Sequence, residues 1–379
     1  MDMRLSYLLT QNDRRPAIRG TIVRLRGITA LPSDQWEICL AGASTSTLKY
    51  LRGEFPTTRI VQGSKLSAVS GRYVIPLGQD TFPADGLTIT SMISHLDASA
   101  ETGAIVGKTA GGASPPALPT LVKFGASALR KSLLERIGGL SPFHGPAADY
   151  DLTFRILSAG SRIDHRADII FQSPASEQKA PGVREIADLL SIARLFLPDH
   201  LSRIYWKDWT TKYQALAADA GRKRDGHLAI LLARLRSITQ YIVAPPPASP
   251  EVIESIFGLR RHAAMIGDWA RRGSVWRVTL ADFSDNLWAT YNACRSSGLQ
   301  IRCIADNNKA FENLSYRDLP IVTAARAFEG GGIDGVILTG TDPSTIGANF
   351  KSVRNHFHGP ILRLCQTPRE ATHAQAVAA

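Results

Sequence analysis

Short apolar segments alternate with amphipathic ones along the first part of the chain, and this alternation constrains the fold more than any other feature. The apolar runs at 5–10, 36–43, 58–63 and 72–78 have the length of buried strands, whereas the segment 16–28 has helical spacing. Strands that alternate with helices at this spacing predict βαβ units and a mostly parallel sheet. We therefore expect an α/β fold.

The same rhythm returns near the end of the chain, with expected strands at 274–281, 299–308, 333–340 and 359–365 and expected helices at 286–298 and 343–356. This pattern predicts a second, smaller Rossmann-like domain. The segment between the two parts is helical in pattern, and the tract "APPPASP" at 244–250 has the composition of a stiff linker. We expect domains at 1–182 and 251–366, a basic helical connector at 183–243 and a disordered tail at 367–379.

The chain carries a net charge of +11, which favours an anionic partner. No nucleic-acid-binding motif accompanies the charge, so we expect no nucleic acid. The N-terminal residues lack the basic-then-apolar order of a signal peptide, and no apolar run is long enough to span a membrane. These observations predict a cytoplasmic protein.

The segment 201–243 combines Trp206 and Trp209 with eight Lys or Arg residues against three Asp residues. Two interpretations stay open. The segment is a packed helical subdomain with a solvated basic face, or it docks peripherally on the anionic surface of the inner membrane.

The stretch "FHGPAADYDLTFRILSAG" at 143–160 places Asp149 and Asp151 at the expected start of a helix. Carboxylates are favoured there by the helix dipole and the free backbone N–H groups, so a purely structural role explains most such pairs. A catalytic role needs support from the surrounding motifs.

Four stretches together resemble the family-2 glycosyltransferases, which have a GT-A fold. They are "MRLSYLLTQNDRRPAIRGTIVRLR", "WEICLAGAST", "SGRYVIPLGQDTFPADGL" and the segment from "FGASALRK" to "AGSRI". The likeness covers about residues 3–200. The last stretch is the most specific, because several of its residues fall at the family's spacing: Gly138, Gly139, Asp149, Asp151, Leu152, Arg155 and Gly160.

The resemblance implies that a sugar is transferred from a nucleotide-sugar donor to a glycan or lipid-linked acceptor in surface polysaccharide assembly. Asp149 is then the catalytic base that takes the proton of the acceptor hydroxyl. Asp151 and Arg155 are supporting residues. Asp80 takes the last position of the family's Asp-x-Asp motif, which binds Mn²⁺ or Mg²⁺, and Gln79 and Ser44 fall on the donor side.

The chain departs from this family at the donor site. Gly78 replaces the first acid of Asp-x-Asp, and Ala41–Ser44 replaces the segment that usually ends in the base-recognising aspartate. A hard divalent cation needs several oxygen ligands, so one carboxylate makes a weak metal site. Two functions follow: a glycosyltransferase with an eroded donor and metal site, or a catalytically inactive glycosyltransferase-like scaffold or binding protein.

In the second domain, Asp306 ends an expected strand at the position where Rossmann-like domains place a ribose-binding acid. The loop at 280–287 lacks the glycines that let a backbone approach a pyrophosphate, and Asp282 and Asp285 would repel phosphate. Nucleotide binding at Asp306, with a sensing role for the domain, therefore competes with a structural or protein-binding role.

Overall fold

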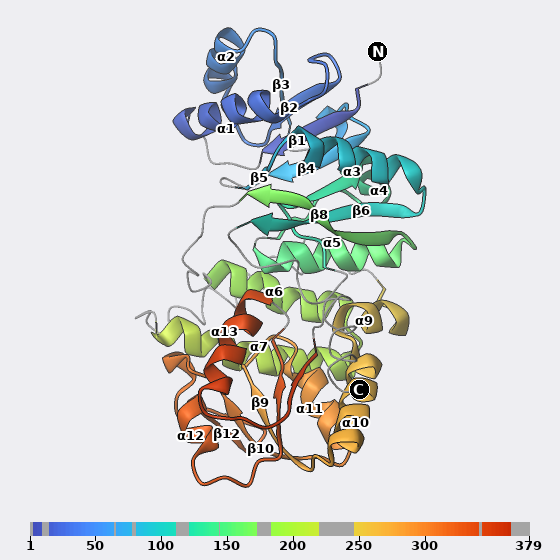
Figure 1. Cartoon of the computed structure of the whole chain (residues 1–379). Coiled ribbons are helices and arrows are strands. Elements are labelled where there is room, and N and C mark those ends of the chain that lie inside the picture. The colour runs from blue at the N-terminus through green and yellow to red at the C-terminus, as the bar shows by residue number, and fades with distance from the viewer. Residues whose placement is uncertain are drawn as a thin grey trace. The chain divides into compact units, whose positions relative to one another are not determined.

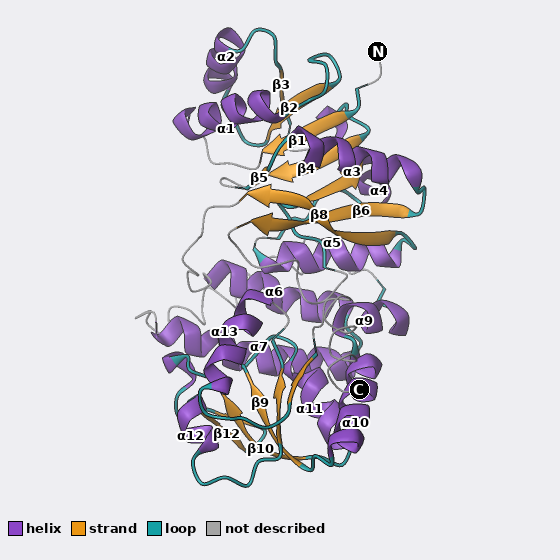
Figure 2. Ribbon diagram, viewed as in Figure 1, coloured by secondary structure: helices purple, strands orange, loops and turns teal. Residues whose placement is uncertain are grey.

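The structure, a computed structural model, describes residues 3–9, 15–63, 66–77, 81–110, 121–143, 145–172, 183–219, 246–340 and 343–364. The chain forms two compact units, one of Met1–Pro115 with Thr120–Glu177 and the other of Pro116–Pro119 with Gln178–Ala379. Each unit is built on its own sheet, with helices packed against it (Figure 1). The expected α/β fold class is confirmed in both units (Figure 2). The expected tail at 367–379 lies outside the described residues.

The first unit contains an eight-stranded sheet in the order β3-β2-β1-β4-β7-β6-β8-β5. The strands from β3 to β4 are mutually parallel, whereas β7 runs antiparallel to both of its neighbours. Its strands are β1 (Leu5–Leu9), β2 (Trp36–Leu40), β3 (Arg59–Gln62), β4 (Tyr73–Leu77), β5 (Phe82–Pro83), β6 (Thr102–Ala110), β7 (Ser127–Arg130) and β8 (Arg162–Gln172). Its helices are α1 (Arg15–Ile28), α2 (Thr45–Glu54), the 3₁₀ turn η1 (Leu66–Ala68), α3 (Gly86–Ala98), α4 (Lys131–Arg136) and α5 (Pro146–Ser158).

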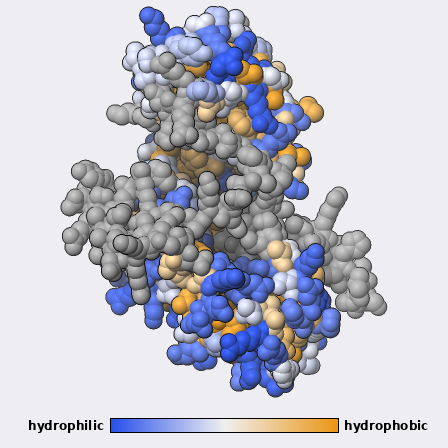
Figure 3. All heavy atoms as spheres, turned by 90° about the vertical axis from the view of Figure 1, so that its left-hand side faces the viewer, coloured by the Kyte–Doolittle hydropathy of each residue, from blue (hydrophilic) through white to orange (hydrophobic). Residues whose placement is uncertain are grey.

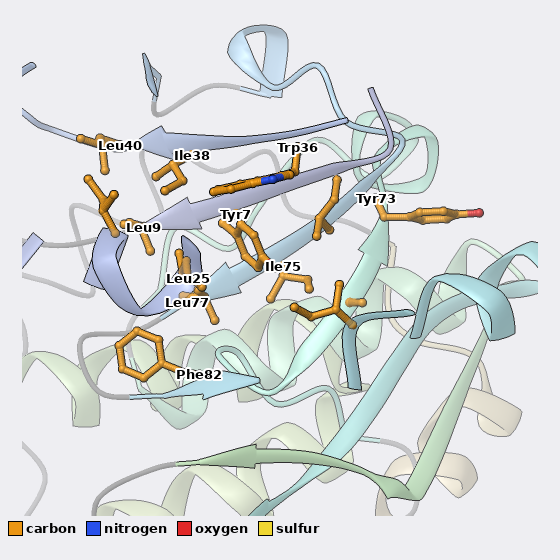
Figure 4. Packing of buried hydrophobic residues seen from close by; sticks show 14 of the residues in the cluster. Tyr7, Leu9, Leu25, Trp36, Ile38, Leu40, Tyr73, Ile75, Leu77 and Phe82 are labelled. Carbon is orange, nitrogen blue, oxygen red and sulfur yellow. The ribbon is translucent and has the colours of Figure 1, made fainter. Parts of the chain in front are cut away.

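The central strands of this sheet are apolar on both faces because both faces are covered. All five residues of β1 are buried. Tyr7 and Leu9 point into one core cluster, which Figure 4 shows with Trp36 and Ile75, while Leu8 belongs to the cluster on the other face. Such a two-sided burial explains why the sequence gives continuous apolar runs here and no strict alternation.

The second unit contains a six-stranded sheet in the order β11-β12-β10-β9-β13-β14, parallel except for the short hairpin of β11 and β12. Of the segment 183–243, which we expected to be a helical connector, the structure describes α6 and α7, and both belong to this unit. The helices are α6 (Val183–Phe196), α7 (Asp199–Asp219), α9 (Pro250–Phe257), α10 (Leu259–Gly273), α11 (Leu287–Ser296), the 3₁₀ turn η2 (Lys309–Phe311), α12 (Ala324–Phe328) and α13 (Pro343–Arg354). The strands are β9 (Arg277–Ala281), β10 (Gln300–Ala305), β11 (Ser315–Tyr316), β12 (Leu319–Val322), β13 (Gly335–Leu338) and β14 (Ile361–Arg363).

The described surface is mixed in character. On the face that Figure 3 shows, hydrophilic side chains predominate and apolar ones form small patches. Among the described residues, no helix combines the length and the hydropathy needed to cross a bilayer.

Candidate functional site

The two aspartates of the acidic motif lie in successive turns of α5. We expected them to open the helix, but α5 begins at Pro146, after Gly145 with φ of 57°. Proline suits this position because its fixed φ is helical and the first turn needs no N–H donor. Asp149 therefore lies in the first turn and Asp151 in the second, and neither caps the helix.

Asp149 holds a segment of chain that precedes β7. Its Oδ1 accepts a hydrogen bond of 2.7 Å from the backbone N–H of Phe124. One turn further along α5, the Oγ1 of Thr153 accepts a bond of 2.8 Å from the N–H of Val122 and donates one of 2.6 Å to the Asp149 carbonyl. Two side chains at i and i+4 on one helix face thus fix the segment 121–124 against α5.

The protonation of Asp149 is set mainly by burial. The residue as a whole is half-buried, and the surrounding protein removes enough water to raise the pKa of the carboxyl to about 7. The Phe124 N–H and the positive charge of Lys123 act in the opposite direction and lower the pKa. A carboxyl with this pKa is partly ionised at neutral pH, which is the range in which a general base works best.

Asp151 and Arg155 form a structural clamp. Asp151 is only 3% exposed, and its Oδ2 accepts hydrogen bonds from both Nε, at 3.1 Å, and Nη2 of Arg155. Burial raises the pKa of Asp151, against the opposing effects of Arg155 and Ser141. The Nη1 of Arg155 also donates to the carbonyls of Ile137, at 2.9 Å, and Gly139, at 2.7 Å. The pair therefore ties α5 to the turn that ends α4.

A cavity of about 580 Å³ opens beside that turn. Residues 138–142 form one wall, and Leu8 of β1, Leu66 of η1 and Glu135 of α4 complete the lining. Because Arg155 holds the carbonyl of Gly139, the clamp also fixes the shape of this wall.

The donor-side residues are only partly described. Ser44 follows β2 and caps α2, because its Oγ accepts a bond of 3.2 Å from the N–H of Thr47. Gly78, Gln79 and Asp80 lie outside the described residues. Their assignment to the donor site, like that of Ser44, stays a prediction.

A divalent metal finds no ready set of ligands in the part of the chain that the structure describes. Within it, no three His, Cys, Asp or Glu side chains are grouped as a metal ion requires. Asp80, the predicted metal ligand, lies outside these residues, so a Mn²⁺ or Mg²⁺ site at Asp80 stays a prediction.

In the second unit, Asp306 follows β10 and serves two backbone groups. Its Oδ2 accepts from the N–H of Phe283, and its Oδ1 accepts from the N–H of Asn308, both at 2.8 Å. Both carboxylate oxygens are therefore used within the protein, where they join the loops that follow β9 and β10.

Helix α7 covers these loops. The Nζ of Lys212 and the Oη of Tyr213 both lie 2.9 Å from Oδ1 of Asp285. Trp209 donates its indole N–H to the Asp285 carbonyl at 2.8 Å, and Tyr205 donates its hydroxyl to the side chain of Asn286 at 2.8 Å. Tyr205, Trp209 and Tyr213 of this basic segment thus pack inside the second unit, at the carboxyl edge where Rossmann-like sheets bind ligands.

Sequence reasoning missed two residues near Asp149. Thr153 fixes the segment 121–124, and Lys123 acts electrostatically on the Asp149 carboxyl. Thr153 could have been noticed in the sequence as a polar residue within an apolar helix face. No sequence pattern indicated Lys123, because its proximity to Asp149 depends on contacts between distant parts of the chain.

No protein-family model and no curated protein matches the chain. Solved glycosyltransferase structures are similar to it. A mannosyltransferase from Pyrobaculum calidifontis, in complex with GDP-Man and Mn²⁺, has 16% sequence identity and a TM-score of 0.42, covering 64% of this chain and 81% of that chain.

Residues 1–349 of S. aureus TarS, in complex with UDP-GlcNAc, have 12% identity and a TM-score of 0.41, covering 83% of this chain and 97% of that chain. Glucosyl-3-phosphoglycerate synthase from Mycobacterium tuberculosis, with Mg²⁺ and UDP, has 17% identity and a TM-score of 0.35, covering 50% and 79%. At these identities and TM-scores, the similarities do not assign a function to this chain.

Proposed function

We infer that the protein is a glycosyltransferase that moves a sugar from a nucleotide-sugar donor to a hydroxyl of a glycan or lipid-linked acceptor. The observation that carries this proposal is Asp149. It is a half-buried residue in the first turn of α5, and burial raises the pKa of its carboxyl to about 7. A carboxylate placed in this way can take the proton of an attacking hydroxyl near neutral pH.

The remaining residues of the motif support the base. Asp151 and Arg155 hold the turn at 138–142 against α5, and this turn lines the cavity. In the reaction, the acceptor oxygen bonds to the anomeric carbon, the bond from that carbon to the nucleoside diphosphate breaks, and Asp149 receives the hydroxyl proton. The donor side would be completed by Ser44, Gln79 and Asp80, and surface polysaccharide assembly at the inner face of the membrane is the proposed setting.

The proposal is tested by sugar transfer with UDP-GlcNAc and GDP-Man as donors, measured as release of the nucleoside diphosphate in the presence of glycan acceptors. Asp149→Asn keeps the size and the acceptor oxygen for Phe124 but removes the base, so turnover should fall roughly 10²- to 10⁴-fold. Asp34→Asn, at an exposed loop position in the same unit, is the matched control and should keep full activity. Normal turnover in Asp149→Asn would contradict the proposed mechanism.

A second function is favoured by the hydrogen bonds of the same residues. Asp149 and Ser44 each accept a backbone N–H, so both have structural roles that a catalytically inactive binding protein would retain. Absence of transfer by the wild type with every donor, together with binding of a nucleoside diphosphate or a glycan, would favour this alternative.

A further inference from the structure

Trp276 of the second unit has a largely exposed aromatic ring on a hydrogen-bonded backbone. Its side chain is 67% exposed, and it is the one large apolar side chain that is exposed among the described residues of this unit. Its backbone is held on both sides: its N–H donates to Asp334 at 3.1 Å, and its carbonyl accepts from the N–H of Gln300 at 2.8 Å. The indole therefore stands on rigid backbone at the start of β9.

A cavity of about 510 Å³ lies beside this ring, between α10 and α11, which pack side by side (Figure 1). Small residues of α10, including Ala263 and Gly267, form one wall, and Val275 and Leu299 add apolar surface. The volume lies within the roughly 300–1,000 Å³ of small-ligand sites.

Hydroxyl groups and positive charge complete the lining. Ser274 lies at the end of α10, and Ser296 and Ser297 lie at the end of α11. Arg271 also lines the cavity and pairs with Asp268, while Arg272 beside it is exposed. No acidic side chain is among the lining residues of the described chain. The site is therefore an aromatic platform next to hydroxyls and a cation.

We propose that this cavity binds an acidic oligosaccharide. A pyranose ring has an apolar face of C–H groups that stacks on an indole, and its edge carries hydroxyls that pair with Ser296 and Ser297. Its carboxylate would pair with Arg271 by charge complementarity, taking the place of the exposed Asp268 side chain that Arg271 contacts in the structure. A nucleobase would instead require buried groups that read its edge, and a docked protein helix would require a larger apolar area.

This function goes beyond sugar transfer, because the site lies in the second unit and uses no residue of the Asp149 motif. It would let the chain bind an anionic glycan without any sugar-transfer reaction. Binding can therefore be measured whether or not the chain is a transferase.

The test uses the full chain and hexasaccharides of mannuronate, galacturonate and hyaluronan as probes, with maltohexaose as the neutral comparison. Binding is followed by calorimetry and by acrylamide quenching of tryptophan fluorescence. At least one acidic probe should bind with Kd below about 1 mM. It should also protect Trp276 from quenching, and this protection should be absent in Trp276→Ala, because the half-buried Trp206, Trp269 and Trp288 contribute to the same signal.

Trp276→Ala should weaken binding at least tenfold, Trp276→Phe should retain part of it, and Arg271→Ala should weaken it at least fivefold. Leu87→Ala removes a side chain that is 76% exposed in the first unit and should bind like the wild type. Three results overturn the proposal: no binding of any acidic probe, equal binding of maltohexaose, or a concentration-dependent dimer that Trp276→Ala abolishes. Unchanged melting of Trp276→Ala confirms that the fold is intact.

Discussion

Asp149 in the first unit and Asp285 in the second are both partly buried carboxylates, but their partners differ. Asp149 accepts one backbone N–H, and no ion pair involves it among the described residues. Asp285 accepts from Lys212 and Tyr213, and the ion pair with Lys212 has side chains 26% and 15% exposed. The first carboxyl is left with a raised pKa, while the second forms an ion pair with Lys212.

This contrast separates two uses of a buried charge. A paired carboxylate repays its desolvation through its partners and contributes to the structure. A carboxylate without a cationic partner destabilises the ionised fold, and such a group is expected where a proton must be exchanged. Asp151 belongs with Asp285, because Arg155 pairs with its carboxylate. Asp306 is satisfied differently, because two backbone N–H groups occupy both of its oxygens.

The largest expected effect is a pH-dependent gain of stability in Asp149→Asn. Because the folded-state pKa is raised to about 7 from the ordinary 3.8, the stability contributed by the protonated carboxyl is complete below pH 4 and is lost as the pH rises through 7. Asn cannot ionise, so Asp149→Asn does not lose stability in this way as the pH rises. Its free energy of unfolding should exceed that of the wild type by at most about 4 kcal/mol at pH 8 and by little at pH 4.

Urea titrations of both proteins between pH 4 and pH 8 measure this difference. Asp34→Asn is the control, with the same curve as the wild type. A stability difference that does not change with pH would show that Asp149 is not a buried acid with a raised pKa.

Asp285→Asn should lower the free energy of unfolding, whereas Asp149→Asn should raise it. The Asp285→Asn change leaves Lys212 buried next to a neutral side chain, although Asp282 and Asp306 still act on it. The free energy of unfolding should fall by about 3 kcal/mol, the usual cost of breaking a buried pair from one side.

The double variant Asp285→Asn with Lys212→Met should recover most of this loss, because it removes the unpaired charge. Asp268→Asn breaks the exposed pair with Arg271 and should cost less than about 1 kcal/mol. Equal losses of stability in Asp285→Asn and Asp268→Asn would show that the ion pair of Asp285 contributes no more to the fold than the exposed pair of Asp268.

Much of the fold could be predicted from local pattern. The apolar runs of the first unit coincide with β1 to β4 within a few residues, and the C-terminal alternation gives β9, β10, β13 and β14. The spacing of apolar residues indicates which segments are buried, so it predicts strands well where both faces of a strand are buried. It does not indicate which distant segment of the chain packs against a given strand or helix.

The candidate site shows this limit. The sequence placed Asp149 and Asp151 in one helix, but their roles depend on Phe124, which lies 25 residues earlier, and on the turn at Gly139. For the basic segment, both interpretations were open because Trp209 is equally suited to a core and to a membrane surface. Its bond to the Asp285 carbonyl, 76 residues away, places it in the second unit.

The smallest expected effect concerns the support of Asp149 by Thr153. Thr153→Val keeps the shape of the side chain but removes the acceptor for the buried N–H of Val122, so the free energy of unfolding should fall by about 1–2 kcal/mol. The hydrogen bond from the Phe124 N–H lowers the pKa of Asp149, and a looser segment 121–124 should weaken this bond. The pKa of Asp149 should then rise. The midpoint of the pH–rate profile for sugar transfer should therefore move to higher pH, with turnover above that midpoint nearly unchanged.

Thr90→Val, which removes a part-buried hydroxyl bonded only within α3, is the matched control and should leave the midpoint in place. A loss of stability with an unchanged midpoint in Thr153→Val would mean that the segment supports the fold but does not set the protonation of Asp149.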